Sequence, residues 1–256
     1  MGINLSKEES LKKIDLRKKE VLNIVEKDES LRGLVSRVAV VMDFSGSMGS
    51  LYRNGSVQSV LERLLPVAMQ FDDNGEMEVW LFDNGFRRMP NMSLNNFYGY
   101  VDREIMQKGY HMGGTCYAPV MQDIYNKYMK EDPANLPDYV MFITDGDNSD
   151  HGDTNRVITM TSRSPIFWQF VGLGSSSFSY LERLDNLSGR YVDNANFFAL
   201  NDFEHVSDSE LYKRLLTEYP QWLRLPQVKD MIANGRASAS SNSTPQKKGL
   251  CGKLFG

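Results

Sequence analysis

The sequence predicts an α/β fold in which a doubly wound, mostly parallel β-sheet is flanked by helices. From residue 34 onward, short apolar runs alternate with amphipathic stretches of helical periodicity, the pattern of repeated strand–helix units. The runs at 38–42 and 139–143 are apolar at every position, as expected of parallel strands that are buried on both faces. With 256 residues, 41% of them hydrophobic, the chain can form one such domain with appended segments.

The chain begins with a predicted amphipathic helix over 7–30. Ser6 and Glu9 have the spacing of a capping box, and apolar residues from Leu11 to Val25 recur at helical spacing. We expect this helix to pack on the outside of the main domain; the alternative is that it binds a partner.

The elements of the main domain follow from the same patterns. The predicted strands are 37–42, 76–82, 87–89, 139–144, 166–171 and 197–200, and the predicted helices are 56–71, 94–107, 118–129, 155–162, 179–187 and 208–216. The third strand should form an edge hairpin with the second through Asp83-Asn84-Gly85, because Asn-Gly supplies positive-φ turn residues.

The chain divides into four segments. We assign 1–33 to the N-terminal helical extension, 34–223 to the α/β domain, 224–234 to a short helix and 235–256 to a flexible tail. Residues 235–244 are rich in Ala, Ser and Asn, which is typical of a linker. Leu250, Leu254 and Phe255 make the end apolar, so it is either a disordered terminus or a docking peptide.

Composition excludes several classes of protein. The net charge of −4 gives no sign of a basic nucleic-acid-binding face. No apolar run approaches the length of a transmembrane helix, and the charged N-terminus lacks a secretory signal. The two cysteines, Cys116 and Cys251, are far apart and do not indicate a disulfide framework, so we expect a cytoplasmic protein.

Oxygen-bearing side chains gather at three separated points. Asp43, Ser45 and Ser47 follow the first apolar run, Thr115 lies in a glycine-rich loop, and Asp145 follows the run at 139–143. Because open α/β sheets place ligands at the carboxyl ends of their strands, these side chains should converge. Hard oxygen donors without His or Cys suit Mg²⁺, with Mn²⁺ or Ca²⁺ as alternatives. Five donors leave one octahedral position for a carboxylate of another molecule.

The three fragments together resemble the metal-ion-dependent adhesion site (MIDAS) of von Willebrand factor type A (VWA) domains, over roughly residues 34–223. Finer similarities, at 64–72, 79–82 and 2–7, resemble the bacterial tellurite-resistance (TerF-like) branch. The resemblance implies a Rossmann-like fold in which the helix at 56–71 stays whole despite Pro66. It also implies that Ser45, Ser47 and Thr115 bind the metal directly, and that Asp43 and Asp145 do so directly or through water.

The function that follows is a non-catalytic, Mg²⁺-dependent protein-binding module whose partner presents an Asp or Glu. The resemblance implies a role in stress or tellurite resistance. Tyrosine and histidine near the motif, namely Tyr52, Tyr110 and His111, are the candidate partner-binding rim; core burial is the alternative for Phe86 and Tyr117. The repulsion between Asp43 and Asp145 should raise the pKa of at least one of them.

An enzyme is the alternative function. A metal-dependent hydrolase or phosphatase would use the ion to activate water, but the chain offers few candidate bases among its three histidines. Cys116 with His111 is a weaker nucleophile–base candidate, and an incidental thiol is favoured. The acids after Asp145, at 147, 150 and 153, are favoured as loop residues and a helix cap over a second cation site.

Overall fold

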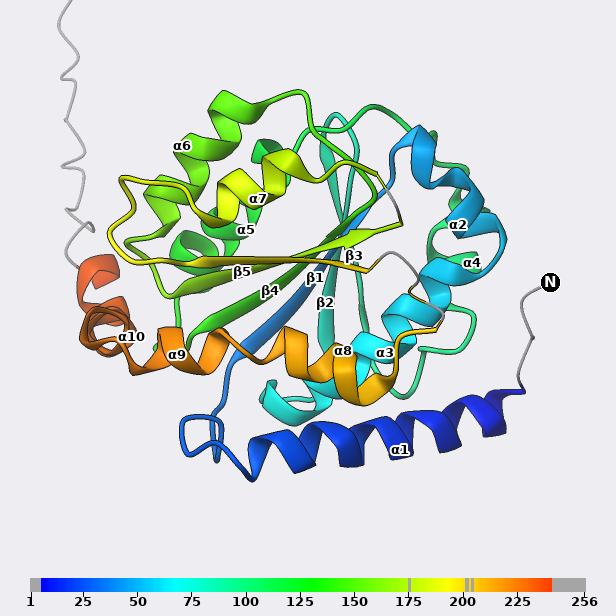
Figure 1. Ribbon diagram of the computed structural model, residues 1–256, viewed down its shortest axis with the longest axis horizontal. Helices are drawn as coiled ribbons and strands as arrows, with labels where there is room; N and C mark the ends of the chain where they lie inside the picture. The colour runs from blue at the N-terminus through cyan, green and yellow to red at the C-terminus, as the bar shows by residue number, and fades with distance from the viewer. Residues whose placement is uncertain (1–5, 175, 201–202, 204, 241–256) are drawn as a thin grey trace, which may run out of the picture.

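The computed structural model describes residues 6–174, 176–200, 203 and 205–240, and the side chains of these residues up to 234. A six-stranded sheet in the order β3-β2-β1-β4-β5-β6 forms its centre (Figure 1). The strands are β1 (Arg37–Asp43), β2 (Met77–Phe82), β3 (Phe86–Met92), β4 (Asp138–Thr144), β5 (Ile166–Leu173) and β6 (Ala195–Leu200). Only the β2–β3 pair is antiparallel, so the predicted fold class is confirmed.

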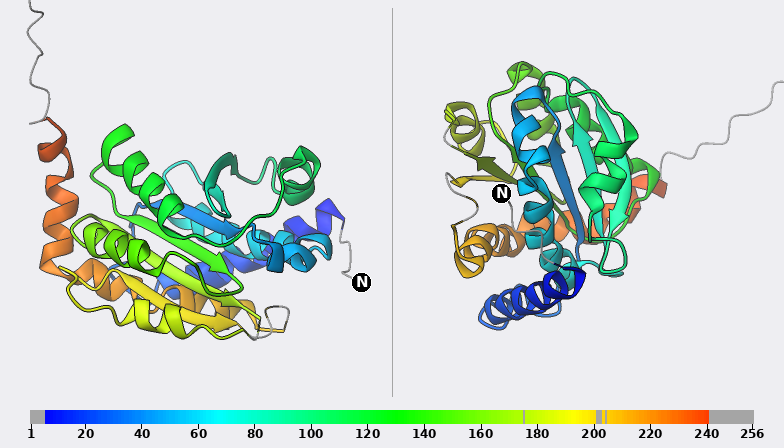
Figure 2. Two further views of the ribbon diagram at one scale, coloured as in Figure 1. Left: turned by 90° about the horizontal axis from the view of Figure 1, so that it is seen from above. Right: turned by 90° about the vertical axis from the view of Figure 1, so that its right-hand side faces the viewer.

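Helices cover both faces of the sheet because alternate residues of the buried strands point to opposite sides (Figure 2). Val38, Val40 and Met42 join one core, and Ala39 and Val41 join the other. The first core holds α1 (Lys7–Val25), α3 (Ser56–Phe71), α4 (Tyr100–Glu104), α8 (Asp208–Leu215) and α9 (Tyr219–Arg224). The second holds α5 (Ala118–Asn126), α6 (His151–Thr161) and α7 (Ser179–Asp185).

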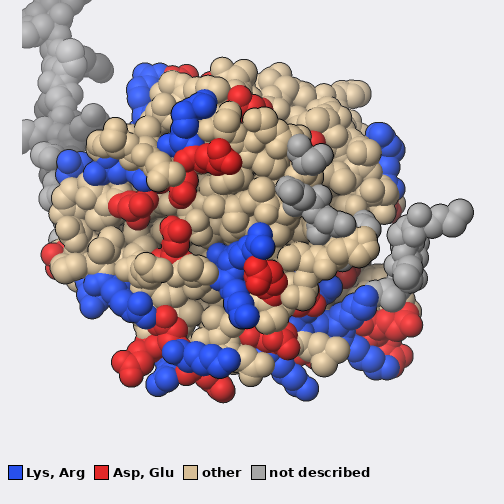
Figure 3. Space-filling model, viewed as in Figure 1, with Lys and Arg blue, Asp and Glu red and all other residues tan. Residues whose placement is uncertain are grey.

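The N-terminal helix α1 packs on α3 and α8 at the outer side of the first core (Figure 1). Its capping box is present, with the Glu9 amide donating to the Ser6 hydroxyl and the Ser6 amide to the Glu9 carboxylate. Ile14 and Val21 are fully buried. The helix ends at Val25, before the predicted residue 30. On the face shown in Figure 3, acidic and basic side chains are interspersed along its surface.

Two predicted helices differ from expectation, one in length and one in helix type. The stretch 94–107 forms only α4 and a 3₁₀ turn at Met106–Lys108. Ser93 donates its amide to the Asn96 side chain, and Gly99 has a φ of 64°, so the chain turns before the helix can start. The helix predicted over 118–129 is α-helical to Asn126 and continues as a π-helix over Lys127–Glu131.

Pro66 leaves α3 continuous, as predicted. The hairpin between β2 and β3 also forms, but its turn is built differently. Gly85 does not have a positive φ. Instead, the Asp83 carboxylate accepts a hydrogen bond from the Gly85 amide at 2.8 Å, so a side chain supplies the turn.

The C-terminal helix differs from the predicted boundary. After α9, the helix α10 runs over Pro226–Ser240 and packs against α9 and the π-helix. The first part of the predicted linker is therefore helical, which its alanines, Ala237 and Ala239, allow because Ala is the best helix former. The remaining tail, 241–256, and its proposed docking peptide lie outside the described residues. Within the described part of the chain, no helix is long and apolar enough to cross a membrane.

Candidate metal centre

The three polar loops lie side by side at the carboxyl end of the sheet. Asp43 is the last residue of β1, and Asp145 directly follows β4, its parallel neighbour. The glycine-rich loop joins them because Ser45 forms a bridge with Gly113, with the Gly46 amide 3.1 Å from the Gly113 carbonyl oxygen. The tertiary structure thus brings together three segments, of which the first and the last are about a hundred residues apart.

A chain of hydrogen bonds connects four of the five candidate ligands. The Asp43 carboxylate accepts from the Ser45 amide at 2.7 Å. The Ser45 and Ser47 hydroxyl oxygens are 3.0 Å apart. The Ser47 hydroxyl donates to Asp145 Oδ1 at 2.8 Å. Two carboxylates and two hydroxyls therefore share one small space.

Thr115, the fifth candidate, is positioned through its backbone. Its carbonyl oxygen accepts from the amide of Ser149 at 2.9 Å and from the hydroxyl at 3.1 Å, and the next amide, of Cys116, donates to the Asp83 carbonyl. The preceding Gly114 packs against Asn84, because a Cβ there would lie 2.5 Å from the Asn84 side-chain oxygen and would displace that side chain. The loop is thereby tied to the loops after both β2 and β4.

Burial raises the pKa of both carboxyl groups. The side chain of Asp43 is inaccessible to solvent, and this raises its pKa to about 6, against the hydrogen bonds from Ser45 and Thr144 that lower it. Burial likewise raises the pKa of Asp145, which is half-buried. Charge repulsion from Asp145 raises the Asp43 pKa less than burial does. Repulsion from Asp145 therefore raises the pKa of Asp43, as expected, but desolvation is the larger effect.

The residues present fit a hard divalent cation. Their donors are carboxylate and hydroxyl oxygens, and a cation would compensate two carboxylates whose charged forms burial disfavours. Among the described residues there is no cluster of three or more His, Cys, Asp and Glu side chains of the kind that holds zinc. The expected centre depends on hydroxyls instead.

One of the three proposed rim residues is misplaced. Tyr52 is only 4% exposed, and its hydroxyl donates to the Asp43 carbonyl oxygen at 2.9 Å while its ring meets the edge of Phe44. It supports the end of β1 from the core and cannot meet a partner there. Tyr110 is exposed, with the Arg87 guanidinium 5.1 Å from its ring centre, and His111 is also exposed.

Phe86 and Tyr117, for which burial was the alternative, differ from each other. Phe86 is 41% exposed at the start of β3, whereas Tyr117 is fully buried. The Tyr117 hydroxyl donates to the Gly146 carbonyl oxygen at 2.6 Å, so Tyr117 holds the loop that carries Asp145. Cys116 has its Sγ 3.3 Å from the Ser149 hydroxyl oxygen, a contact that does not support pairing with His111.

Two functional residues were not recognised in the sequence. The Thr144 hydroxyl donates to Asp43 Oδ2 at 2.6 Å and so orients that carboxylate. The feature of the sequence that could have identified Thr144 is a hydroxyl side chain at the end of an apolar strand. Asp150, expected among the loop acids, makes no side-chain capping bond to α6. Its carboxylate accepts from the amides of Tyr117 and Ala118 at 2.9 and 2.8 Å, so it caps α5 and joins two loops of the site.

Comparisons with known proteins show the family to which this fold belongs. Residues 35–232 match the family model described as the VWA domain found in the TerF C terminus. The uncharacterised protein YcbR of Bacillus subtilis (strain 168) is 42% identical over 244 residues, covering 94% of this chain and 98% of YcbR.

Solved structures show the same fold at low sequence identity. The SpRpn10 VWA domain has a TM-score of 0.54 at 8% identity, covering 70% of this chain and 94% of that one. Proximal thread matrix protein 1 from the mussel byssus has a TM-score of 0.51 at 16% identity, covering 74% of this chain and 46% of that one. From the family match and the 42% identical relative, we conclude that the chain belongs to the VWA family, in its TerF-like branch.

Proposed function

We propose that this chain is a non-catalytic protein-binding module whose partner is held through Mg²⁺ at the MIDAS residues. The observation that carries the proposal is the hydrogen-bonded set Asp43, Ser45, Ser47 and Asp145 at the ends of β1 and β4, with Thr115 on the adjoining loop. Membership of the VWA family supports a metal-dependent interaction.

Each residue has a distinct part in the proposed site. Ser45, Ser47 and Thr115 would hold the ion through their hydroxyl oxygens, and Asp43 and Asp145 would balance its charge directly or through water. Two buried hydroxyl groups orient Asp43: Thr144 donates to its carboxylate, and Tyr52 donates to its carbonyl oxygen. A bound Mg²⁺ would offer its remaining coordination position to an Asp or Glu of the partner. Mn²⁺ and Ca²⁺ are the alternative ions.

The module's context follows from the family. The match to a domain of TerF supports a role in a bacterial stress or tellurite-resistance system, and the composition supports a cytoplasmic location. The role is tested by measuring the tellurite survival of a strain that lacks this chain and of a strain that carries the Asp145→Ala variant.

Metal-dependent capture tests the binding function itself. Wild-type chain in millimolar Mg²⁺ should retain proteins that a chelator releases, and Asp145→Ala should retain none of them. Asp147→Ala is the matched control, because it removes a more exposed carboxylate from the same loop. Retention that is equal in wild type, Asp145→Ala and chelator would contradict the proposal.

One observation favours the hydrolase alternative. His151 Nε2 lies 2.7 Å from Asp147 Oδ1, and the imidazole stacks on Tyr180 with ring centres 3.8 Å apart. The pair begins two residues after Asp145 and is the candidate base that an enzyme would need. We expect no hydrolysis of generic phosphate esters in Mg²⁺ or Mn²⁺ above a metal-only blank. Turnover that both Asp145→Asn and His151→Ala abolish would establish an enzyme instead.

A further inference from the structure

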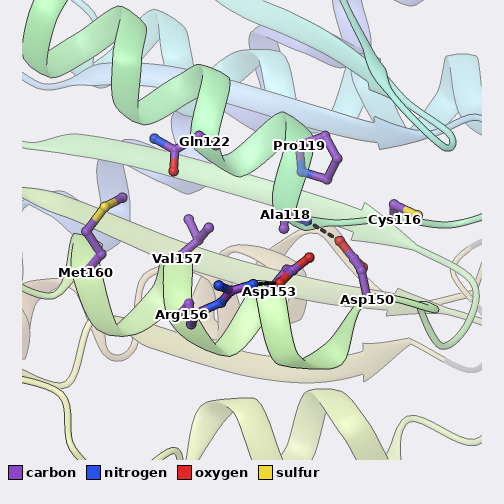
Figure 4. A pocket seen from close by; sticks show the side chains of 9 residues that line it. All are labelled: Cys116, Ala118, Pro119, Gln122, Asp150, Asp153, Arg156, Val157 and Met160. Atoms are coloured by element: carbon purple, nitrogen blue, oxygen red, sulfur yellow. Dashed lines mark hydrogen bonds and ion pairs between the residues drawn. The ribbon is translucent and has the colours of Figure 1, made fainter.

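A groove of about 500 Å³ lies between α5 and α6 (Figure 4). Ala118, Pro119, Val157 and Met160 give it an apolar surface, and Met160 is 38% exposed although it is a large apolar side chain. Gln122, Asp153 and Arg156 lie at its polar edges, where the last two form an ion pair.

The groove continues directly from the candidate metal centre. One wall starts at Cys116, the residue after Thr115, and the other starts at Asp150 on the loop that follows Asp145. The Asp150 carboxylate, bonded to the first amides of α5, holds the two walls together (Figure 4). Ser149 joins them again through its bonds to the Thr115 carbonyl oxygen. A segment bound at the metal therefore meets a preformed apolar surface beside it.

From this continuity we propose that the α5–α6 groove is the specificity subsite of the metal centre and takes a large apolar side chain of the partner. The inference rests on the proposed function. The partner would be an extended segment that presents an acidic residue to the metal and a Leu, Met or Phe to the groove.

The dimensions and charges limit what that segment can be. From Asp150 to Met160 the α6 wall is about 15 Å long, which an extended chain spans in about five residues. Once the segment has passed from the metal to Asp150, the apolar residue must therefore lie within about the next five residues. Asp153 and Arg156 neutralise each other at the edge, and the Asp150 carboxylate accepts hydrogen bonds from the amides of Tyr117 and Ala118, so the groove attracts neither sign of charge strongly. The metal therefore selects the acidic residue of the partner, and the apolar area of the groove selects the partner's large apolar residue.

The probe is a displayed library of random peptides, each carrying one fixed Asp. The peptides are about twelve residues long, so that they span both subsites. Peptides bound in Mg²⁺ and eluted by chelator should share a large apolar residue at a constant offset from that Asp. The same library with Ala in place of the Asp should give no chelator-eluted peptides.

Variants of the groove test the assignment directly. Met160→Asp places a charge in the groove and Gln122→Trp fills it, so each should weaken an enriched peptide about tenfold, the lower range for losing one buried large side chain. Leu16→Asp is the matched control on α1, since Leu16 is an exposed apolar helix residue remote from the groove, and it should leave the affinity unchanged. An unchanged Mg²⁺-induced melting shift would show that the variants keep the metal centre.

The other outcomes are separable. Chelator-eluted peptides without an apolar preference, or with affinities that neither groove variant changes, would overturn the subsite while leaving the proposed function intact. If chelator elutes no Asp-containing peptide from wild type, the proposed function fails and the subsite with it. A tenfold gain in peptide affinity on deleting 241–256 would assign the groove to the chain's own C-terminal segment. Self-association that Met160→Asp abolishes would assign it to a second copy.

Discussion

Asp43 is the residue on which the candidate site depends most. It ends the central strand, is inaccessible to solvent and accepts hydrogen bonds from both Ser45 and Thr144. These contacts hold its carboxylate in place, while burial raises its pKa to about 6. Metal binding and protonation should therefore compete for the same oxygens.

The pH dependence follows from that pKa. The pKa of Asp43 is about 6 in the folded chain and 3.8 for an ordinary aspartate, so its protonated form stabilises the metal-free fold below pH 4, and this contribution is lost as the pH rises through 6. The loss amounts to about 3 kcal/mol at most. Denaturant unfolding of wild type and Asp43→Asn between pH 4 and 7 would measure it, since the variant should lack this part of the change.

The same titration predicts the pH dependence of metal binding. Because only the ionised carboxylate binds a cation, Mg²⁺ affinity should fall roughly tenfold between pH 7 and pH 5. Calorimetric titration at the two pH values measures this. Equal affinities at both would show that Asp43 does not contribute as described.

Asp145→Ala should separate metal binding from folding. The change removes one hydrogen bond, from Ser47, and one partly buried carboxylate, so the metal-free fold should persist. It should abolish the stabilisation by Mg²⁺, which is about 2.7 kcal/mol when the ion is a hundredfold above its dissociation constant. Melting curves with and without Mg²⁺ measure both effects, with Asp147→Ala as control. A full Mg²⁺-induced shift in Asp145→Ala would mean that the ion binds elsewhere.

At the scale of the elements, α1 is part of the first core. Ile14 is fully buried, and Arg17 shares the Asp208 carboxylate with Arg63 of α3, so a side chain at the start of α8 joins three helices. Ile14→Ala should therefore lower the free energy of unfolding by about 2–4 kcal/mol. Leu16→Ala, at a side chain that is 62% exposed, should change it by less than about 0.5 kcal/mol. Urea denaturation measures both, and equal small effects would show that α1 is undocked in solution.

At the scale of the whole molecule, the described core ends with α10. Val228 is fully buried there, whereas residues 241–256 are mostly small or polar in the sequence. Deleting 241–256 should therefore change the free energy of unfolding by less than about 0.5 kcal/mol. A thermal melt of the truncated chain checks this, and a large loss of stability would place the tail in the core.

The sequence by itself determined the architecture of this protein and the chemistry of its candidate centre. Strands buried on both faces require continuous apolar runs, and such runs locate β1 and β4. The oxygen ligands at the ends of those strands are local features that can be read directly from the sequence. Boundaries were less predictable where side chains intervene, as at Asn96 and Asp83, which build turns by hydrogen bonds.

Only the tertiary structure decided the environment of each residue. Tyr52 faces the core rather than a partner, Asp150 caps α5 rather than α6, and burial raises the pKa of Asp43 more than repulsion from Asp145 does. The α5–α6 groove likewise exists only when two helices, distant in sequence, pack beside the same metal loops. Burial, long-range capping and desolvation arise from contacts between remote segments, which is why local sequence patterns do not contain them.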